Sequence, residues 1–394
     1  MNLLVILYEV TQFLLLAWLG YCILYITTLA ISGLFFKQKT RSKSIRPLPN
    51  IAVLIPAYKE NEVILDTVSQ ALKQGYKQFD VVLIADSMES KILNEIRQMN
   101  VTVIEVSFEK STKAKALNFA MNKLPDNYQM AVVLDADNIM GMGALNIMAK
   151  EYSNGFNAIQ GHRTAKNQET GFAILDAISE EMNNHITCKG AQIVGLPSRL
   201  AGSGMAFDYQ LFKKLMKKID AIGGFDKVLE LELIDSGNKV QYIESAHIYD
   251  EKVSSSNVFS NQRKRWLSSQ YYYLEKYFMK SFGKLLTGQF SYFLKVTTFI
   301  FPPRILLPVI ILVLYLIALI IGNNFFILIW GAAFILNVFA YTISIPGKFW
   351  NSTILRAFLS LPRAFIIIAL AVFKLKGANN HFIHTPHSSK IKNE

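Results

Sequence analysis

The chain has 394 residues, of which 52% are hydrophobic, and its formal net charge is +12 at pH 7. So many apolar residues argue against an ordinary soluble enzyme, and the length allows one large domain or two small ones. We expect no nucleic-acid partner, because no nucleic-acid-binding motif occurs and anionic membrane lipids explain the charge better. With only two cysteines, Cys22 and Cys188, the chain has no disulfide framework.

The first long apolar segment runs from Phe13 to Phe36 and predicts a membrane anchor. It is long enough to cross a hydrocarbon core of about 30 Å. A cleaved signal peptide is the alternative, but the segment lacks a basic start and is too long for a signal core. We therefore expect residues 1–47 to form a retained transmembrane anchor followed by a basic linker.

The orientation of this anchor follows from the cations that come directly after it. No acidic residue interrupts the cluster, which consists of Lys37, Lys39, Arg41, Lys43 and Arg46. Cytoplasmic loops of membrane proteins are enriched in such residues. We therefore expect an integral protein of the cell (inner) membrane, with the region that follows in the cytoplasm.

The middle of the chain alternates short apolar runs with longer amphipathic ones. The apolar runs predict strands at 51–58, 80–86, 101–106 and 130–137, and the amphipathic segments predict helices near 60–74, 88–99 and 113–123. This alternation predicts an α/β fold with a mostly parallel sheet and helices on both of its faces. Neither a dinucleotide-binding glycine motif nor a phosphate-binding P-loop is present.

Polar side chains follow several of these predicted strands. Asp135 and Asp137 end the fourth strand, while Tyr58 with Glu60 and Asp86 end the first and second. Residues two apart in a strand point to the same side, so the two aspartates should converge at the rim where such sheets bind ligands. Paired carboxylates suit a divalent cation, Mg²⁺ or Mn²⁺. A solvated turn is the alternative, because Asp and Asn also favour turns.

Six short motifs in a fixed order resemble one known family. They are PAYKE (56–60), Asp86, KAKALN (113–118), Asp-Ala-Asp (135–137), AGSGM (201–205) and QRKRW (262–266). In this order they resemble processive family 2 glycosyltransferases, which are membrane enzymes such as cellulose, hyaluronan and poly-N-acetylglucosamine synthases. The resemblance implies a GT-A domain, Rossmann-like with a mixed and mostly parallel sheet, over residues 48–260. It also implies a nucleotide-sugar donor, a divalent metal and inversion at the anomeric carbon.

The resemblance assigns one set of residues to the donor. This set consists of Ala57, Tyr58, Glu60, Asp86, Lys113, Asp135 and Arg265. Tyr58 suits stacking on a nucleobase, and Asp86 suits accepting a hydrogen bond from a ring N–H. Lys113 and Arg265 suit the diphosphate, and Asp135 with Asp137 would hold the metal, which acts as a Lewis acid on the departing nucleotide.

The general base is less clear, because the sequence departs from the family. In GGFDKVLELELIDSG (223–237), Asp226 stands where the family has its catalytic aspartate, but Phe225 replaces the acidic neighbour. Asp226 would take the proton of the acceptor hydroxyl. An N-cap of the helix that Gly237 ends is the alternative role for Asp226. Glu230, one turn further on the same face, is the alternative base.

The acceptor is assigned to two further motifs. Gly202, Ser203 and Gly204 predict a tight loop against which a sugar lies, although a plain turn is the alternative. In QRKRW, Gln262, Arg265 and Trp266 share one helical face, while Arg263 and Lys264 point away toward lipid phosphates. Trp266 offers a platform for a sugar ring. We expect residues 261–304 to form interfacial helices that carry this motif.

The remaining chain predicts two transmembrane helices within 305–349, at 305–322 and 325–345. The apolar run 365–373 is too short for a further span, so 350–394 should form an amphipathic interfacial helix, with Arg356, Arg363 and Lys374 on one stripe, and a tail. So few spans leave little room for a channel, which suggests a homo-oligomer or a secretion partner.

These observations predict a membrane-embedded hexosyltransferase that passes a hexose from a nucleotide sugar, with a UDP-sugar as first choice, to a growing polysaccharide. One alternative is a single-addition glycosyltransferase with a lipid or lipid-linked acceptor. The other, from a different class, is a membrane receptor that binds a nucleotide sugar without turnover.

Overall fold

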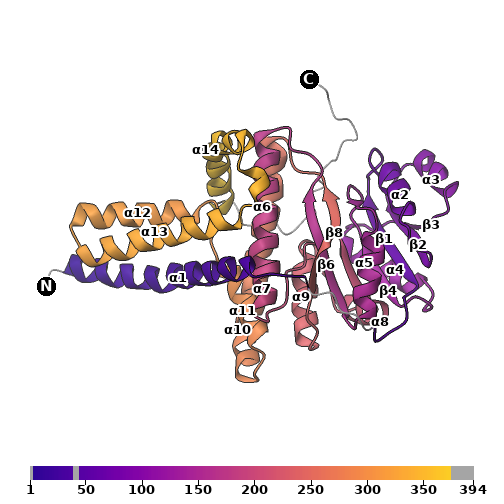
Figure 1. Ribbon diagram of the computed structural model, residues 1–394, viewed down its shortest axis with the longest axis horizontal. Coiled ribbons are helices and arrows are strands. Elements are labelled where there is room, and N and C mark those ends of the chain that lie inside the picture. The colour runs from indigo at the N-terminus through magenta and orange to yellow at the C-terminus, as the bar shows by residue number, and fades with distance from the viewer. Residues whose placement is uncertain (1–2, 39–43, 374–394) are drawn as a thin grey trace.

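The computed structural model describes residues 3–38 and 44–373 of the chain. Figure 1 shows three layers along the long axis. A bundle of α1 (Leu3–Leu34), α12 (Leu307–Ile321) and α13 (Asn324–Ser344) forms one end, and a β-sheet forms the other. Between them lie α6 (Gly171–Asn183), α10 (Ser256–Leu286), α11 (Phe290–Thr297) and α14 (Ser352–Phe373).

The sheet has eight strands in the order β3-β2-β1-β4-β7-β6-β8-β5. Their bounds are β1 Ile51–Tyr58, β2 Phe79–Asp86, β3 Thr102–Val106, β4 Met130–Val133, β5 Ile139–Met140, β6 Ala158–Ala165, β7 Met205–Asp208 and β8 Gln241–Asp250. The strands β3, β2, β1 and β4 are mutually parallel, as are β6 and β8, whereas β7 pairs antiparallel with β4 and β6, and β5 with β8. The predicted mixed, mostly parallel α/β sheet is confirmed.

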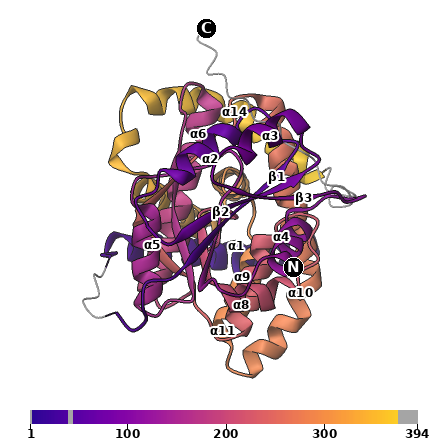
Figure 2. The same ribbon diagram turned by 90° about the vertical axis from the view of Figure 1, so that its right-hand side faces the viewer.

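Helices cover both faces of the sheet, because successive strand residues point to opposite sides and both sides are apolar. Ala52 and Leu54 of β1 pack toward α4 (Lys113–Lys123), α8 (Tyr209–Met216) and α9 (Phe225–Asp235). Ile51 and Val53 pack toward α2 (Ile64–Leu72), α3 (Ser90–Arg97) and α5 (Ala144–Ser153). Figure 2, viewed from the sheet end, shows α5 on one side of the sheet and α4 and α8 on the other.

A π-helix joins the anchor to the middle layer. It is η1 (Asn184–Gly190), which continues α6 and leads into α7 (Ala191–Ile193). A Cβ atom on Gly190 would lie 2.0 Å from the Leu29 carbonyl oxygen, so only glycine allows α1 to approach this closely. The short 3₁₀ turns η2 (Thr298–Ile300) and η3 (Gly347–Phe349) precede α12 and α14. Helix α1 is therefore packed directly on the middle layer of the molecule.

The apolar helices differ in length from the membrane spans that we predicted. Helix α1 begins at Leu3 rather than Phe13, and α12 has only 15 residues, about 22 Å at ~1.5 Å per residue. Within residues 3–38 and 44–373, three helices are long and apolar enough to cross a membrane: Leu3–Leu34, Asn324–Ser344 and Ser352–Val372. Our statement that the segment after Trp350 is too short was wrong, because residues on both sides of Pro362 join one helix.

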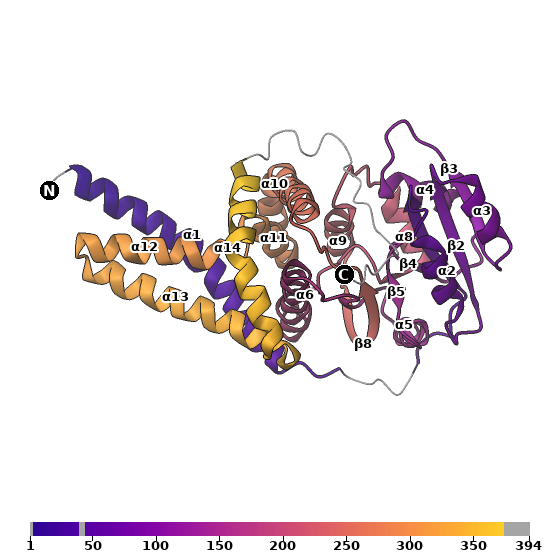
Figure 3. The same cartoon turned by 90° about the horizontal axis from the view of Figure 1, so that it is seen from above.

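The direction of α14 nevertheless differs from that of the bundle. Figure 3 shows α14 running across α12 and α13 rather than alongside them, so its interfacial placement remains a proposal. The predicted boundary between residues 260 and 261 falls inside α10, which begins at Ser256. Lys39, Arg41 and Lys43 of the basic cluster, and Lys374 with the tail, lie outside the described residues.

Candidate active site

A cavity of about 1160 Å³ begins at the carboxyl ends of β1, β2 and β4 and extends between the helices of the middle layer. Nearly all the predicted site residues line it, although they come from distant parts of the sequence. They are Ala57, Tyr58, Glu60, Asp86, Lys113, Asp135, Asp137, Gly202, Asp226, Glu230, Gln262, Arg265 and Trp266. Ser203 and Gly204 do not line it.

The end of the cavity at β1 and β2 is shaped by two tight backbone turns. Tyr58 and Asp86 are direct neighbours in the parallel ladder, so both motifs end at the same level. Lys59 and Ser87, which follow them, have φ angles of 57° and 55°, a conformation uncommon for residues with side chains. The Lys59 amide donates to the Asp86 carbonyl at 3.1 Å. Asp86 is only 2% exposed, and the Ser87 hydroxyl donates to its carboxylate at 3.0 Å.

The aspartate pair does not end a strand, and our geometric argument for its convergence was wrong. Strand β4 ends at Val133, and residues 135–138 form the turn that leads into β5. Tertiary contacts hold this turn instead. The Asp135 amide donates to the Ser203 hydroxyl at 2.9 Å, and the Thr67 hydroxyl donates to the Ala136 carbonyl at 2.6 Å. Both carboxylates line the same cavity.

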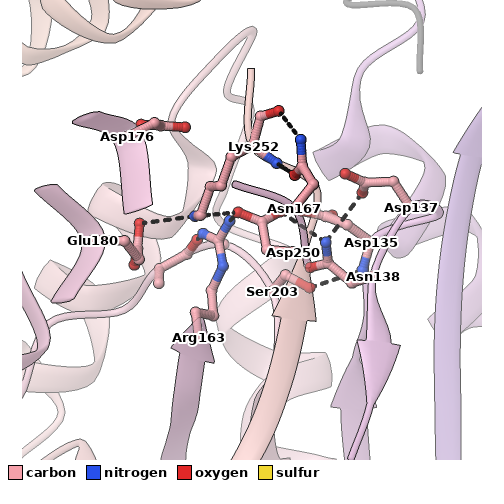
Figure 4. Close-up of polar contacts among 12 residues, drawn as sticks. Asp135, Asp137, Asn138, Arg163, Asn167, Asp176, Glu180, Ser203, Asp250 and Lys252 are labelled. Atoms are coloured by element: carbon pink, nitrogen blue, oxygen red, sulfur yellow. Dashed lines mark hydrogen bonds and ion pairs between the residues drawn. The ribbon is translucent and has the colours of Figure 1, made fainter. Parts of the chain in front are cut away.

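A buried ionic network lies beside this turn and supports it (Figure 4). Asp250, at the end of β8, pairs with Arg163 of β6 at 2.5 Å and with Lys252 at 2.7 Å. Burial raises the pKa of Asp250, but the two cations outweigh it and hold that pKa below its usual value. The Asn138 amide donates to Asp250 at 2.8 Å and to Asp137 at 3.2 Å. The network thus fixes Asn138 beside Asp137.

Our sequence reasoning missed Arg163, which also donates to the Ala201 carbonyl and so reaches the AGSGM loop. The available signal was a charged residue within the otherwise buried strand β6.

Lys113 lies at the centre of the site. The Thr112 hydroxyl caps α4 by accepting from the Lys115 amide, so Lys113 is the first residue of the helix. Its ammonium pairs with Asp135, donates to the Gly202 carbonyl at 2.8 Å and lies 5.1 Å from the centre of the Phe225 ring. Phe225, which departs from the family pattern, thus packs against the cation predicted to meet the diphosphate.

The carboxylates of α9 have contrasting surroundings. Gly224, with φ of 64°, is the N-cap and Asp226 lies within the first turn, so the N-cap alternative for Asp226 was wrong. Glu230 is 2% exposed, pairs with Lys295 at 2.6 Å and accepts from the Leu200 amide at 3.1 Å. Burial raises the pKa of Glu230, while Lys295 and the Leu200 amide oppose that rise. Glu230 therefore braces the loop that leads to Gly202.

The AGSGM loop is tight, as predicted, but it faces the cavity only through Gly202. Ser203 is 0% exposed and holds the Asp135 amide, and a Cβ atom on Gly204 would lie 2.4 Å from the Ile248 side chain. Both residues are therefore behind the cavity wall, which contradicts our assignment of Ser203 and Gly204 to the acceptor. They support the aspartate turn.

The QRKRW segment places Gln262, Arg265 and Trp266 on the cavity, and Arg263 lines it as well. Our prediction that Arg263 faces lipid was wrong: it pairs with Asp176 of α6 and lies 4.4 Å from the centre of the Trp266 ring. Burial lowers the pKa of Arg265, while Asp135 and Asp226 act in the opposite direction. Arg265 is thus within electrostatic reach of both the predicted metal ligand and the predicted base.

The residues present fit a divalent cation that the protein and a donor hold together. Within the described ranges no group of three or more His, Cys, Asp and Glu side chains could hold a metal. Asp135 and Asp137 offer two carboxylates at one cavity, and the buried amide oxygen of Asn138 has no hydrogen-bond partner. Mg²⁺ sites commonly combine one or two carboxylates with substrate phosphates.

Residues 49–269, more than half of the chain, match the sequence profile of the family "Glycosyltransferase like family 2". The chain belongs to this family and is a glycosyltransferase with a GT-A fold, so the prediction of a nucleotide-sugar receptor without turnover is not supported.

Two known proteins are similar to this chain, one in sequence and one in structure. The poly-β-1,6-N-acetyl-D-glucosamine synthase of Staphylococcus aureus (strain COL) is 25% identical over 178 residues, which cover 43% of this chain and 41% of the synthase. The match therefore spans less than half of the length of that curated relative. The solved mannosyltransferase PcManGT from Pyrobaculum calidifontis, in complex with GDP-Man and Mn²⁺, has a TM-score of 0.51 and 14% identity. That likeness covers 94% of this chain and 93% of PcManGT, and it shows the shared fold.

Proposed function

We propose that the chain transfers a hexose from a nucleotide sugar to a hydroxyl of a lipid-linked acceptor, with inversion at the anomeric carbon. One observation carries this proposal. The cavity that begins at Asp135 and Asp226 continues into a gap lined by apolar residues of α13 and α14, among them Val338, Phe358 and Phe365. An acceptor with a polar head and an apolar tail matches such a cavity, because each half meets its own kind of surface.

In this proposal the donor occupies the sheet end of the cavity. Tyr58 stacks on the nucleobase, and Asp86 accepts a hydrogen bond from a ring N–H. Lys113 and Arg265 bind the diphosphate, which requires Lys113 to exchange its ion pair with Asp135 for the donor. Asp135 and Asp137 would hold Mg²⁺ or Mn²⁺, which supplies Lewis-acid neutralisation of the departing nucleotide.

Asp226 acts as the general base in this scheme. Its carboxylate, at the start of α9, lines the cavity next to the residues that would hold the donor. It takes the proton of the acceptor hydroxyl as that oxygen attacks the anomeric carbon from the face opposite the diphosphate. Trp266, braced by Arg263, provides the surface on which the acceptor sugar lies. Glu230 is less suited to this role, because Lys295 and the Leu200 amide already engage its oxygens.

Extension of a polysaccharide is the second candidate. The similarity to the poly-β-1,6-N-acetyl-D-glucosamine synthase, over 43% of this chain, favours it. The two candidates differ in product: one predicts a lipid glycoside longer by one sugar, the other a polymer. For both we propose that residues 44–255 form the catalytic domain on the cytoplasmic side.

The test is to incubate the purified full-length protein with Mn²⁺ and radiolabelled UDP- and GDP-sugars. Alkyl glycosides serve as lipid acceptors and lipid-free oligosaccharides as controls. Label in an alkyl glycoside longer by one sugar supports the proposal, and a polymer supports the second candidate. Phe358→Gln should raise the KM for the alkyl glycoside, whereas Leu359→Gln, which alters an exposed neighbour outside the cavity, should not. Equal effects would contradict a lipid site between α13 and α14.

A further inference from the structure

Apart from Arg265, which is assigned to the donor, the cations that line the cavity fall into two groups. In the first group each has a carboxylate partner: Lys113 with Asp135, Arg163 with Asp250, Arg263 with Asp176 and Lys295 with Glu230. In the second group are Arg199, Lys227 and Arg304, and none of them forms an ion pair with any carboxylate in residues 3–38 and 44–373. Cations in a partly buried site normally have a counter-charge, because an uncompensated charge there costs free energy.

Arg199 is the clearest case. Its backbone is fixed on both sides, since its amide donates to the Thr187 carbonyl at 3.1 Å and its carbonyl accepts from the Cys188 thiol at 3.8 Å. Arg199 lines the cavity, yet within the described ranges its guanidinium has no hydrogen bond or ion pair to the protein. A fixed backbone with an unengaged cationic side chain is the arrangement of a binding residue rather than of a structural one.

The side chains of Lys227 and Arg304 form hydrogen bonds to neutral groups only. The Lys227 ammonium contacts the Ser269 hydroxyl at 3.3 Å, and Arg304 donates to the Ser179 carbonyl at 3.0 Å and to the Asn183 side chain. Burial lowers the pKa of Lys227, Asp226 opposes this, and Arg199 lowers it further. Burial also lowers the pKa of Arg304, and Arg199 again adds to the effect. Arg199 therefore repels both Lys227 and Arg304 in the one cavity that all three line.

The three cations come from other elements than the residues assigned to the donor diphosphate. Lys227 follows the proposed base Asp226 in α9, and Arg304 stands just before α12, with its carbonyl accepting from Tyr341 of α13 at 3.3 Å. Lys227 thus lies beside the proposed base, and Arg304 lies beside α13, which lines the apolar gap. The donor diphosphate already has Lys113 and Arg265 at the aspartate turn.

We propose that Arg199, Lys227 and Arg304 form a subsite for the phosphate or diphosphate that joins the acceptor's sugar to its lipid. This inference rests on the proposed lipid-linked acceptor and adds its chemical class. With the phosphate at these cations, the acceptor sugar extends toward Trp266 and Asp226 and the chain enters the apolar gap. Charge-assisted hydrogen bonds from two arginines favour a phosphate strongly over a neutral linkage.

The test measures binding to the full-length protein in neutral detergent, with farnesyl diphosphate, farnesol and UDP with Mn²⁺ as probes. The wild-type protein should bind farnesyl diphosphate at least ~10-fold more tightly than farnesol, as expected for hydrogen bonds to a charged group. Arg199→Gln and Arg304→Gln should remove most of this difference and leave the Kd for UDP unchanged. Lys264→Gln, which removes a cation of α10 that does not line the cavity, is the matched control.

The outcomes separate the possible failures. Equal binding of farnesol and farnesyl diphosphate by the wild type overturns the subsite. A matching rise in the Kd for UDP in the arginine variants assigns these cations to the donor and also overturns it. Equal competition by phosphatidylglycerol assigns them to bulk lipid instead. If neither farnesyl compound binds while UDP does, the proposed lipid-linked acceptor itself is wrong.

A stability measurement guards against misfolding. Arg199→Gln removes no protein hydrogen bond; it removes repulsion of Lys227 and Arg304 and also attraction to Glu180, so its melting temperature should stay close to that of the wild type. A lower melting temperature would indicate a structural role for Arg199 and contradict the subsite.

Discussion

Glu230→Gln tests which carboxylate of α9 is catalytic, because it changes one charge and almost no volume. The substitution leaves Lys295, whose side chain is 18% exposed, without its partner at 2.6 Å. Removing one member of a buried ion pair costs about 3–5 kcal/mol, and the partial exposure of Lys295 places the expected cost near ~3 kcal/mol. A glutamine can still accept the hydrogen bond from the Leu200 amide, so that contact adds little.

The expected readout is a loss of stability with retained catalysis. At roughly 2–4 °C per kcal/mol, the melting temperature should fall by about 6–12 °C. A thiol-reactive fluorescent dye can follow unfolding, since Cys22 and Cys188 are free and buried. The double variant Glu230→Gln/Lys295→Met removes both charges and should recover most of the loss. Below the transition, Glu230→Gln should keep kcat within about tenfold of the wild type.

Asp226→Asn is the partner measurement. It should cut kcat by at least ~10²-fold, the low end for a general base, without lowering the melting temperature. Gly224 caps the helix, so no cap is lost. The reasoning would be refuted if Glu230→Gln were inactive while still folded and Asp226→Asn remained active. In that case the base would be Glu230, and the ion pair with Lys295 would set its protonation.

Asp137→Asn should abolish turnover at an unchanged melting temperature, because it removes the negative charge of a proposed metal ligand without changing the shape of the side chain. Near-normal activity in saturating Mn²⁺ and Mg²⁺ would exclude a metal role for Asp137. Trp266→Ala should raise the KM for the acceptor more than that for the nucleotide sugar, since stacking needs the ring while in our proposal Lys113 and Arg265 hold the diphosphate; equal changes would indicate a structural role. A cysteine at Lys37 should resist impermeant thiol reagents added to intact cells. Labelling there would show that this segment lies outside the cell, opposite to the predicted topology. A cysteine at Ser388, which lies outside the described residues, should resist them too if α14 is interfacial, and labelling would mean that α14 crosses the membrane.

The strands and the order of the motifs were readable from the sequence, because both depend on local chemistry. Strand β1 has the predicted bounds, and β2 and β3 differ from theirs by one residue. A buried parallel strand is apolar along its whole length. Such a continuous apolar run can be recognised in the sequence without any knowledge of long-range contacts. The start of α4 at Lys113 is equally local, since the Thr112 hydroxyl caps it.

Partnerships between distant segments were decided only by the tertiary structure. The sequence identified Asp135 and Asp137 but wrongly placed them in a strand, because contacts from Ser203, Thr67 and Asp250 shape that turn. These residues lie far from one another in the chain, and the pattern of apolar residues does not predict which of them come into contact.

The same limit applies to the charges of the site. The sequence identified Glu230, but only the packing of α11 against α9 brings Lys295 to it, and only the fold leaves Arg199 without an ion pair among the residues that the structure describes. The sequence does not indicate which opposite charge a charged residue pairs with, because ion pairs form between whichever elements the core brings together. The sequence therefore identified the family and a set of candidate site residues, most of which line the cavity, and the tertiary structure decided which charges of the cavity form ion pairs among the described residues.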